Sequence, residues 1–241
     1  MTSIFGTELA DILNGDSLDN TIFGLSGDDV LFGRTGDDTI NGNQGLDFVF
    51  GDAGNDVLFG GQGDDNISGD STLDDGTSGN DLLFGNLGED YLSGDEGNDS
   101  IFGGQGDDLV VGDEGNDFVS GDLGDDAIWG VDTTGLNPGA GEIDTLTGGA
   151  GADFFYIGGS FTTTYYTAFG NSDYAIITDF NSLEDDLIVT HDGDNYSIDN
   201  LTLPGAGTGT GVFLTTAGQN ELVAFVQGVD TNNLSLIQDF I

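Results

Sequence analysis

A nine-residue pattern, Gly-x-x-Gly-x-Asp-x-apolar-x, recurs fifteen times between Gly6 and Tyr156. The first position is always Gly and the eighth is always apolar, whereas the fourth is Gly in twelve copies and the sixth is Asp in fourteen. Only the eighth and fourteenth copies contain extra residues, at 71–77 and 132–140. A register this short and this strict requires a structure that repeats with the same period.

Each position of the pattern has a physical reason. Glycine at the first and fourth positions is expected to allow a positive φ and a close approach of neighbouring turns. The last three residues alternate outside, inside and outside, so that an apolar residue such as Leu31 or Val49 points inward from a short strand. One such residue cannot build a core alone. The sequence therefore predicts an all-β solenoid whose stacked coils share a continuous apolar column.

The pattern resembles the hemolysin-type repeat GGxGxDxUx of the RTX (repeats-in-toxin) family of bacterial calcium-binding proteins, and its clearest copy is GGQGDDLVV at 103–111. The resemblance covers residues 6–156. It implies a right-handed parallel β-roll with two repeats per coil and with Ca²⁺ ions between stacked turns at both edges.

The same resemblance implies the metal ligands, which are sixth-position carboxylates and backbone carbonyls of the fourth-position glycines. The carboxylates of one edge are those of Asp29, Asp47, Asp65, Asp90, Asp108 and Asp126, those of the other edge are Asp38, Asp56, Asp81, Asp99 and Asp117, and Asp153 follows in the last copy. The glycines are Gly27, Gly36, Gly45, Gly54, Gly63, Gly88, Gly97, Gly106, Gly115 and Gly124. Leu9, Leu18 and Glu142 replace the fourth-position glycine, which predicts incomplete sites in the first, second and fourteenth copies.

The composition favours the same metal. The chain carries 45 Asp and Glu against one basic side chain, Arg34, and its formal net charge is −44. Carboxylates at this density repel one another unless cations neutralise them. With no Cys and a single His, His191, the chain suits Ca²⁺ rather than Zn²⁺ or Cu²⁺, and Mg²⁺ demands a stricter octahedron.

A halophilic or disordered acidic chain is the alternative reading of this charge. The fixed register of the acids, together with 36% hydrophobic residues and 17 Phe, argues against it. Without metal, however, we expect the chain to be disordered, so that calcium binding contributes part of the free energy of folding.

The segments outside the regular repeat have a different character. Residues 1–5 lead into the roll, and in residues 157–241 runs such as 161–166 and 222–226 predict strands. The segments AIITDF (175–180) and EDDLIV (184–189) resemble the pattern that follows the roll in many RTX proteins, which implies a β-rich cap; a small ligand-binding domain is the alternative. The two insertions are expected to be surface loops, although Asp74, Asp75 and Asp132 could provide an extra cation site.

The RTX resemblance also implies a bacterial, extracellular or cell-surface protein. No apolar run near Met1 has the form of a secretory signal, and no segment is long enough to span a membrane. Members of the family are exported unfolded by a type I system that reads an uncleaved C-terminal signal, and residues 238–241 resemble its acidic-then-apolar end. Extracellular modules bind calcium with dissociation constants on the order of 10⁻⁴ to 10⁻³ M, so that the chain would fold outside the cell.

The seventh and ninth positions point away from the column, yet they are often apolar. The odd-numbered copies present Ile12, Val30, Phe32, Phe48, Phe50, Tyr91, Leu109, Val111, Trp129, Phe154 and Tyr156, and the even-numbered copies present Phe23, Val57, Phe59, Leu82, Phe84, Phe102 and Phe118. Such a surface exceeds the apolar patch of an ordinary monomer. We hypothesise that the odd face is covered by the C-terminal region or by a second copy of the chain, or contacts a surface partner.

The sequence predicts a non-catalytic protein. It contains no HExxH, no GxSxG, no Lys and no Cys, and His191 lies in an Asp- and Gly-rich turn. We expect a calcium-binding structural, cell-surface or matrix component. The alternatives are an adhesion module that recognises a glycan or protein through the aromatic face or the C-terminal region, and, less favoured, a carboxylate-based glycan-active enzyme. The net charge disfavours nucleic acid and anionic membranes.

Overall fold

The computed structural model describes residues 2–70, 78–131, 139, 141–157, 173–189, 195–216, 219–234 and 236–238. These residues form β-strands and turns, and none of them belongs to a helix. Accordingly, this part of the chain has no helix that could cross a membrane.

The strands form two sheets. The twelve-stranded sheet has the order β1 (Thr2–Phe5), β3 (Asn20–Ser26), β5 (Thr39–Gln44), β7 (Val57–Gln62), β9 (Leu82–Leu87), β11 (Ser100–Gln105), β13 (Phe118–Leu123), β15 (Ile143–Ala150), β17 (Tyr174–Ile177), β21 (Gln219–Gln227), β20 (Gly207–Thr216) and β19 (Asn195–Leu203). The ten-stranded sheet has the order β2 (Ile12–Asn14), β4 (Val30–Thr35), β6 (Phe48–Ala53), β8 (Asn66–Ser68), β10 (Tyr91–Ser93), β12 (Leu109–Val111), β14 (Ala127–Trp129), β16 (Phe154–Tyr156), β18 (Asp186–Val189) and β22 (Leu236–Gln238).

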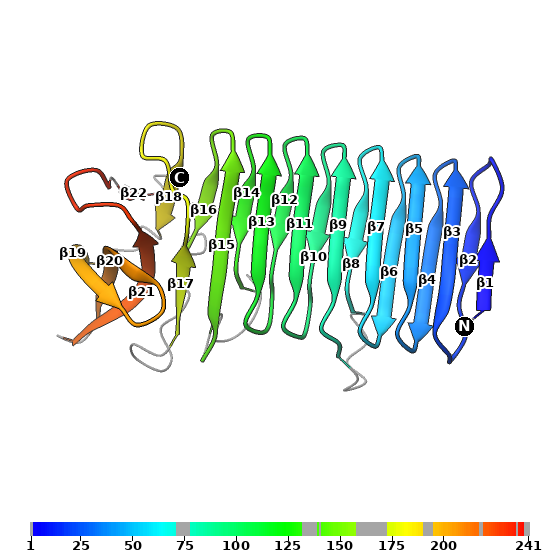
Figure 1. Ribbon diagram of the computed structural model, residues 1–241, viewed down its shortest axis with the longest axis horizontal. Helices are drawn as coiled ribbons and strands as arrows, with labels where there is room; N and C mark the ends of the chain where they lie inside the picture. The colour runs from blue at the N-terminus through cyan, green and yellow to red at the C-terminus, as the bar shows by residue number, and fades with distance from the viewer. Residues whose placement is uncertain are drawn as a thin grey trace.

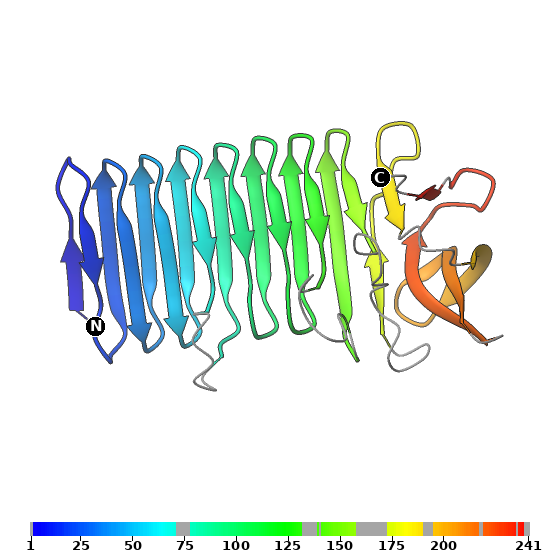
Figure 2. The ribbon, with the colours of Figure 1, turned by 180° about the vertical axis from the view of Figure 1, so that it is seen from behind.

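The chain alternates between the two sheets, so that two repeats make one coil (Figures 1 and 2). Each strand of the repeats pairs in parallel with the strand one coil away; Ile22, for example, pairs with Ile40, which pairs with Leu58. Even-numbered copies form the twelve-stranded sheet and odd-numbered copies form the ten-stranded sheet. The structure confirms the expected all-β parallel β-roll.

The eighth-position side chains fill the space between the sheets. Those of the second to fifteenth copies are fully buried: Ile22, Leu31, Ile40, Val49, Leu58, Ile67, Leu83, Leu92, Ile101, Val110, Val119, Ile128, Leu146 and Phe155. Burial of each contributes about 1.5 to 3 kcal/mol of hydrophobic free energy. The core is therefore a single apolar column, one side chain from each repeat.

The glycines of the repeat act differently from our expectation in one respect. Positive φ occurs at the fourth position, as in Gly45 (140°), and also at the second, as in Asp52 (68°), but at none of the first-position glycines, all of which are described. The positive φ expected at the first position is therefore wrong. That glycine is needed for close approach instead, because a Cβ on Gly33 would lie 2.5 Å from both the Asp38 Oδ2 and the Gly51 carbonyl oxygen.

Beyond Tyr156 the nine-residue pattern ends, but the two sheets continue. Strands β17 and β18 pair in parallel with β15 and β16, and β21 and β22 add one more strand to each sheet. Strands β19 and β20 form an antiparallel hairpin beside β21, at the opposite end of the roll from β1 (Figure 2). Val212, Leu214 and Val226 pack in the same apolar cluster as the column.

Among the described residues, this placement does not support the part of our hypothesis in which the C-terminal region covers the odd face. The described C-terminal strands extend the roll at its end, and they do not lie over the outer surface of the ten-stranded sheet (Figures 1 and 2). The physical reason is that the last coil offers unpaired strand edges, which the C-terminal strands satisfy with backbone hydrogen bonds.

Replacing Gly45 by Ala should measure the importance of the close approach between coils. The new Cβ would lie 2.6 Å from the carbonyl carbon of Gly27, at a φ of 140°. We expect Gly45→Ala to lower the free energy of unfolding by more than about 3 kcal/mol in urea denaturation with saturating Ca²⁺.

The matched control is Gly205→Ala, where φ is also positive (94°) but no heavy atom lies within 4 Å of the added Cβ. This variant should lose only the conformational cost, about 1 to 2 kcal/mol. An equal loss of unfolding free energy in the two variants would show that Gly45 is not required for the close contact between coils.

Candidate metal centre

The sixth-position side chains form two hydrogen-bonded ladders, one along each edge of the roll. In each ladder the Oδ1 atom accepts a hydrogen bond from the backbone N–H of the sixth-position residue one coil earlier. One ladder joins Asp11, Asp29, Asp47, Asp65, Asp90, Asp108, Asp126, Asp153 and Asp185, with N···O distances of 2.7 to 3.2 Å. The other joins Asn20, Asp38, Asp56, Asp81, Asp99, Asp117 and Asp144, at 2.6 to 2.9 Å.

The second carboxylate oxygen of most ladder residues has no hydrogen-bond donor. The Oδ2 atoms are buried and accept no hydrogen bond in Asp29, Asp38, Asp47, Asp56, Asp65, Asp81, Asp90, Asp99, Asp108, Asp117 and Asp126. A buried anionic oxygen without a partner costs several kcal/mol, and native proteins contain only a few buried polar groups of any kind without a partner. A series of them along two edges therefore indicates sites for cations.

Burial raises the pKa of these carboxyl groups. The pKa reaches about 8 in Asp56, Asp81, Asp99, Asp108 and Asp117, about 7 in Asp65 and Asp126, and about 6 in Asp38, Asp47, Asp90 and Asp153. Desolvation is the main cause, the backbone N–H of the ladder opposes it, and the neighbouring carboxylates add to it. Without a cation, the ladders cannot all be ionised at neutral pH.

Backbone carbonyls complete the donor set. Nowhere in the described part of the chain do three or more His, Cys, Asp or Glu side chains gather as a metal-binding group. Carbonyl oxygens do lie beside the carboxylates. Asp38 Oδ2 and the Gly51 carbonyl oxygen, for example, both lie 2.5 Å from the position that a Cβ on Gly33 would occupy. At Gly97, the corresponding point faces the Gly79 carbonyl and, at 3.0 Å, Asp99 Oδ1.

This donor set fits Ca²⁺. It consists of carboxylate and carbonyl oxygens, which are the ligands that calcium takes in a flexible geometry. The absence of nitrogen and sulfur ligands from the ladders disfavours zinc and copper. The residues that could hold the ions are therefore the ladder aspartates together with the glycine carbonyls of the turns.

The structure brings together the carboxylates that the sequence singled out. All twelve, from Asp29 to Asp153, lie on the two ladders and are buried, and the Oδ2 of Asp153 is the only one of the twelve that is not among the oxygens without a partner. The ten fourth-position glycines predicted as carbonyl ligands, from Gly27 to Gly124, lie in the turns with positive φ, whereas Gly79 in the eighth copy does not have a positive φ.

Sequence reasoning missed further candidates. Asp144, fully buried in the fourteenth copy, accepts the Asp117 N–H at 2.9 Å and continues the ladder. Glu142 in the same copy is half-buried, and burial raises its pKa to about 7. Asp185 accepts the Asp153 N–H at 3.2 Å. Asp144 holds the repeat's sixth position and could have been found, whereas Asp185 lies outside the nine-residue register.

In the first two copies, the corresponding side-chain oxygen has a hydrogen-bond donor from the protein itself. The Asp11 Oδ2 accepts hydrogen bonds from the Thr7 backbone N–H at 2.6 Å and from its hydroxyl at 2.8 Å. Asn20 is neutral, and its Oδ1 accepts the Asp16 N–H at 2.7 Å. Neither copy therefore leaves an ionised oxygen that needs a metal.

The repeats match the family model of the RTX calcium-binding nonapeptide repeat at residues 5–40, 14–49, 41–72, 75–110, 102–131 and 139–160. Together these stretches cover more than half of the sequence. The chain belongs to the RTX family. RTX nonapeptide repeats bind Ca²⁺, and the buried ladders of this RTX chain are consistent with several calcium sites. No curated protein matches the sequence.

Several predicted features lie outside the described residues. They are the predicted strand at 161–166, His191, the insertion at 71–77, the insertion at 132–140 except residue 139, and the chain end from Asp239 to Ile241. The hypotheses about an extra cation site and an export signal therefore remain predictions from the sequence.

The raised pKa values predict how the metal-free roll responds to pH. Asp81, for example, has a pKa of about 8 in the folded chain against an ordinary value of 3.8. Between these values the folded state binds more protons than the unfolded state, so its stability falls as the pH rises. In a calcium chelator, we expect the chain to gain β structure on acidification from about pH 8 to pH 5, measured by circular dichroism.

Loss of β structure over the same acidification would contradict this assignment of buried, protonated ladder carboxyls. The calcium-loaded chain is the control. In it the cations neutralise the ladders, and β structure should change little until protons displace the metal.

Proposed function

We propose that this RTX protein is an extracellular, non-catalytic structural component of a bacterial cell surface or matrix, and that Ca²⁺ drives its folding. The observation that carries the proposal is the pair of ladders, in which eleven buried carboxylate oxygens have no hydrogen-bond donor. A chain of net charge −44 that buries such oxygens needs cations to become compact.

The proposed ligands are the carboxylates of the predicted ladder residues and the carbonyls of the turn glycines. Asp99 illustrates the arrangement, because the Asp81 N–H orients its Oδ1 at 2.7 Å while its Oδ2 remains without a donor. The backbone thus holds each carboxylate in place before the ion arrives. Calcium, when bound, supplies the positive charge that the ladders lack.

Calcium dependence supports an extracellular role. Sites built from carbonyls and carboxylates in extracellular modules bind Ca²⁺ with dissociation constants on the order of 10⁻⁴ to 10⁻³ M. They therefore bind Ca²⁺ more weakly than cytosolic sensors do. A chain with such sites would remain unfolded during export and fold outside. Export by a type I system is the route that RTX membership favours.

The environment of the ladder carboxylates supports the non-catalytic role. Ladder carboxylates of the repeats are engaged by backbone N–H groups and buried in turns, so that they are not presented to a substrate in a cleft. Asp99 and its counterparts repeat the same environment coil after coil, as a scaffold requires and a single active site does not.

Calorimetry and circular dichroism with and without a chelator test the proposal. We expect the chain to bind several Ca²⁺ ions and to gain β structure as it does so. A chain that is equally folded in chelator at neutral pH would overturn the claim that calcium drives folding.

The variant Asp99→Asn tests the ligand assignment, and Asp199→Asn, which removes the same charge from an exposed position on β19, is its control. We expect Asp99→Asn to bind fewer ions and to fold at an about tenfold higher calcium concentration, because a charge-assisted ligand contributes about 1.5 to 3 kcal/mol. In chelator it should be no less structured than the parent. Identical calcium titrations of the two variants would remove Asp99 from the ligand set.

A further inference from the structure

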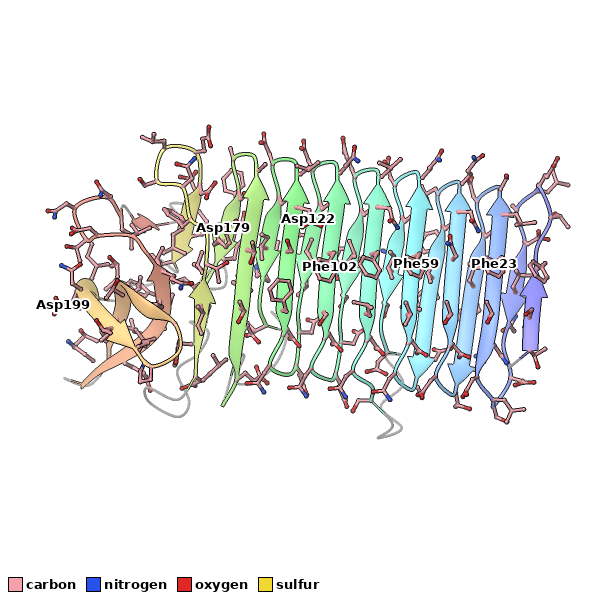
Figure 3. The ribbon with its side chains drawn as sticks, in the orientation of Figure 1. Phe23, Phe59, Phe102, Asp122, Asp179 and Asp199 are labelled. Atoms are coloured by element: carbon pink, nitrogen blue, oxygen red, sulfur yellow. The ribbon has the colours of Figure 1, made fainter. Side chains whose placement is uncertain are left out.

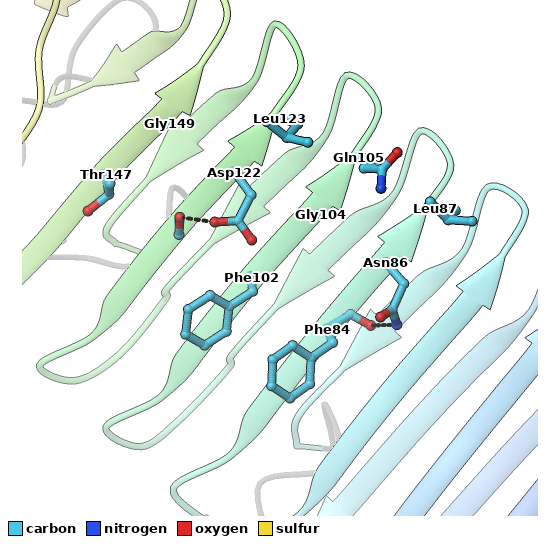
Figure 4. A pocket seen from close by; sticks show the side chains of 11 residues that line it. Phe84, Asn86, Leu87, Phe102, Gly104, Gln105, Asp122, Leu123, Thr147 and Gly149 are labelled. Atoms are coloured by element: carbon cyan, nitrogen blue, oxygen red, sulfur yellow. Dashed lines mark hydrogen bonds between the residues drawn. The ribbon is translucent and has the colours of Figure 1, made fainter.

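A shallow groove with a volume of about 590 Å³ lies on the outer face of the twelve-stranded sheet, across β9, β11, β13 and β15 (Figure 4). The Phe84 and Phe102 rings lie on one side of it, and Leu87 and Leu123 lie on the other. Its middle row consists of second-position residues, of which Gly104 and Gly149 have no side chain (Figure 4). The hollow beside the phenylalanine rings exists because Gly104 separates two larger neighbours, Asn86 and Asp122.

The residues that form the groove occupy positions that the nine-residue pattern leaves free. At the ninth position of even copies, Phe59, Phe84 and Phe102 form a line along the sheet that ends at Ser120 (Figure 3). At the second position, Gly104 lies between Asn86 and Asp122. Neither the calcium ladders nor the apolar column requires these choices, so they are available to serve recognition.

The phenylalanine rings offer part of their faces. Phe84 stacks on Phe59 with centroids 5.1 Å apart and planes 7° apart, and Phe102 stacks on Phe84 at 5.2 Å and 13°. Parallel rings in direct face-to-face contact would be about 3.5 to 4.0 Å apart, so these rings are offset like shingles. Phe102 also contacts the tilted Phe118 ring at 5.6 Å and 45°, and Phe84 and Phe102 both remain partly exposed. The exposed part of each face carries the negative side of the ring quadrupole and attracts C–H groups.

Polar groups lie within reach of the same hollow. The partly exposed Asp122 accepts a hydrogen bond from the Ser120 hydroxyl at 2.7 Å, and a carboxylate has further acceptor sites. The Asn86 amide donates to the Phe84 carbonyl at 3.3 Å, which uses one of its two N–H donors. The exposed Gln105 amide stands on the rim. The groove thus combines an apolar platform with hydroxyl-binding groups.

We propose that this groove binds a neutral sugar ring of a polysaccharide, with the ring's C–H face on Phe84 and Phe102 and its hydroxyl groups hydrogen-bonded to Asp122, Asn86 and Gln105. The proposal rests on the calcium-folded surface scaffold proposed above and adds the class of its partner.

Charge and polarity select this occupant. The only basic side chain of the protein is Arg34, which lies in β4 of the other sheet, so that nothing in the groove compensates an anionic ligand. A purely apolar ligand would remove water from Asp122, Asn86 and Gln105 without replacing its hydrogen bonds. A pyranose presents both an apolar face and a hydroxyl rim, and it matches both halves of the groove.

Binding of the full chain to soluble polysaccharides in millimolar Ca²⁺ tests the proposal by calorimetry. The panel contains neutral dextran, a β-1,3-glucan and a galactomannan, and its charged controls are anionic dextran sulfate and the cationic polypeptide polylysine. We expect binding to at least one neutral polysaccharide, and we expect Phe102→Ala and Asp122→Asn each to weaken it about tenfold.

Phe23→Ala is the matched control, because Phe23 holds the same register position on β3 and stacks on Phe5 at 5.3 Å, outside the groove. It should leave binding unchanged. Circular dichroism in Ca²⁺ establishes that each variant is folded, and if Phe102→Ala does not fold, Asp122→Asn alone decides.

No binding to any neutral polysaccharide, binding only to dextran sulfate or only to polylysine, or an equal loss in Phe23→Ala would overturn the proposal. Calcium titration of the same samples separates this failure from a failure of the proposed function. A chain that folds with Ca²⁺ but binds no neutral glycan loses the groove assignment alone.

Discussion

Electrostatic repulsion between stacked carboxylates is the constraint on which the rest of this structure depends. Neighbouring strands lie about 4.8 Å apart, so that Asp81 and Asp99 cannot separate without breaking the sheet. Their Oδ1 atoms are tied to backbone N–H groups, and their Oδ2 atoms are buried without a donor. The strand pairing that builds the roll therefore also creates the demand for cations, and the two cannot be separated energetically.

The apolar column alone gives the roll only a small hydrophobic core. Each coil of the repeats contributes only two large inward side chains, such as Leu83 and Leu92, which is a narrow core for a long molecule. Small cores in proteins are commonly supplemented by disulfides or metals, and this sequence has no cysteine. Metal binding then becomes part of the free energy of folding. Under the proposed function, the roll is therefore a fold that depends on metal.

The outward positions separate the two faces of the roll. At the seventh and ninth positions of the repeats, aromatic residues are more numerous on the ten-stranded sheet than on the twelve-stranded sheet. On the ten-stranded sheet Trp129 and Tyr156 stack at 4.0 Å, and Phe32 and Phe50 stack at 5.1 Å. Association of that face with a second copy or another partner stays a prediction. The groove lies on the other sheet, because a hollow needs a position without a side chain beside the aromatic rings. Gly104 provides that position next to Phe84 and Phe102.

The nine-residue pattern by itself determined an all-β solenoid and the buried eighth position, because both follow from the local alternation of a strand that repeats every nine residues. The resemblance of the pattern to the RTX repeat added the parallel β-roll and the two edges of carboxylates. Only the tertiary structure decided that positive φ falls at the second position rather than the first, that Asp185 extends a ladder beyond the repeats, and that Gly104 lies between Asn86 and Asp122. These features depend on contacts between residues eighteen or more positions apart. Such contacts are set by how coils stack, and a pattern confined to one repeat contains no record of them.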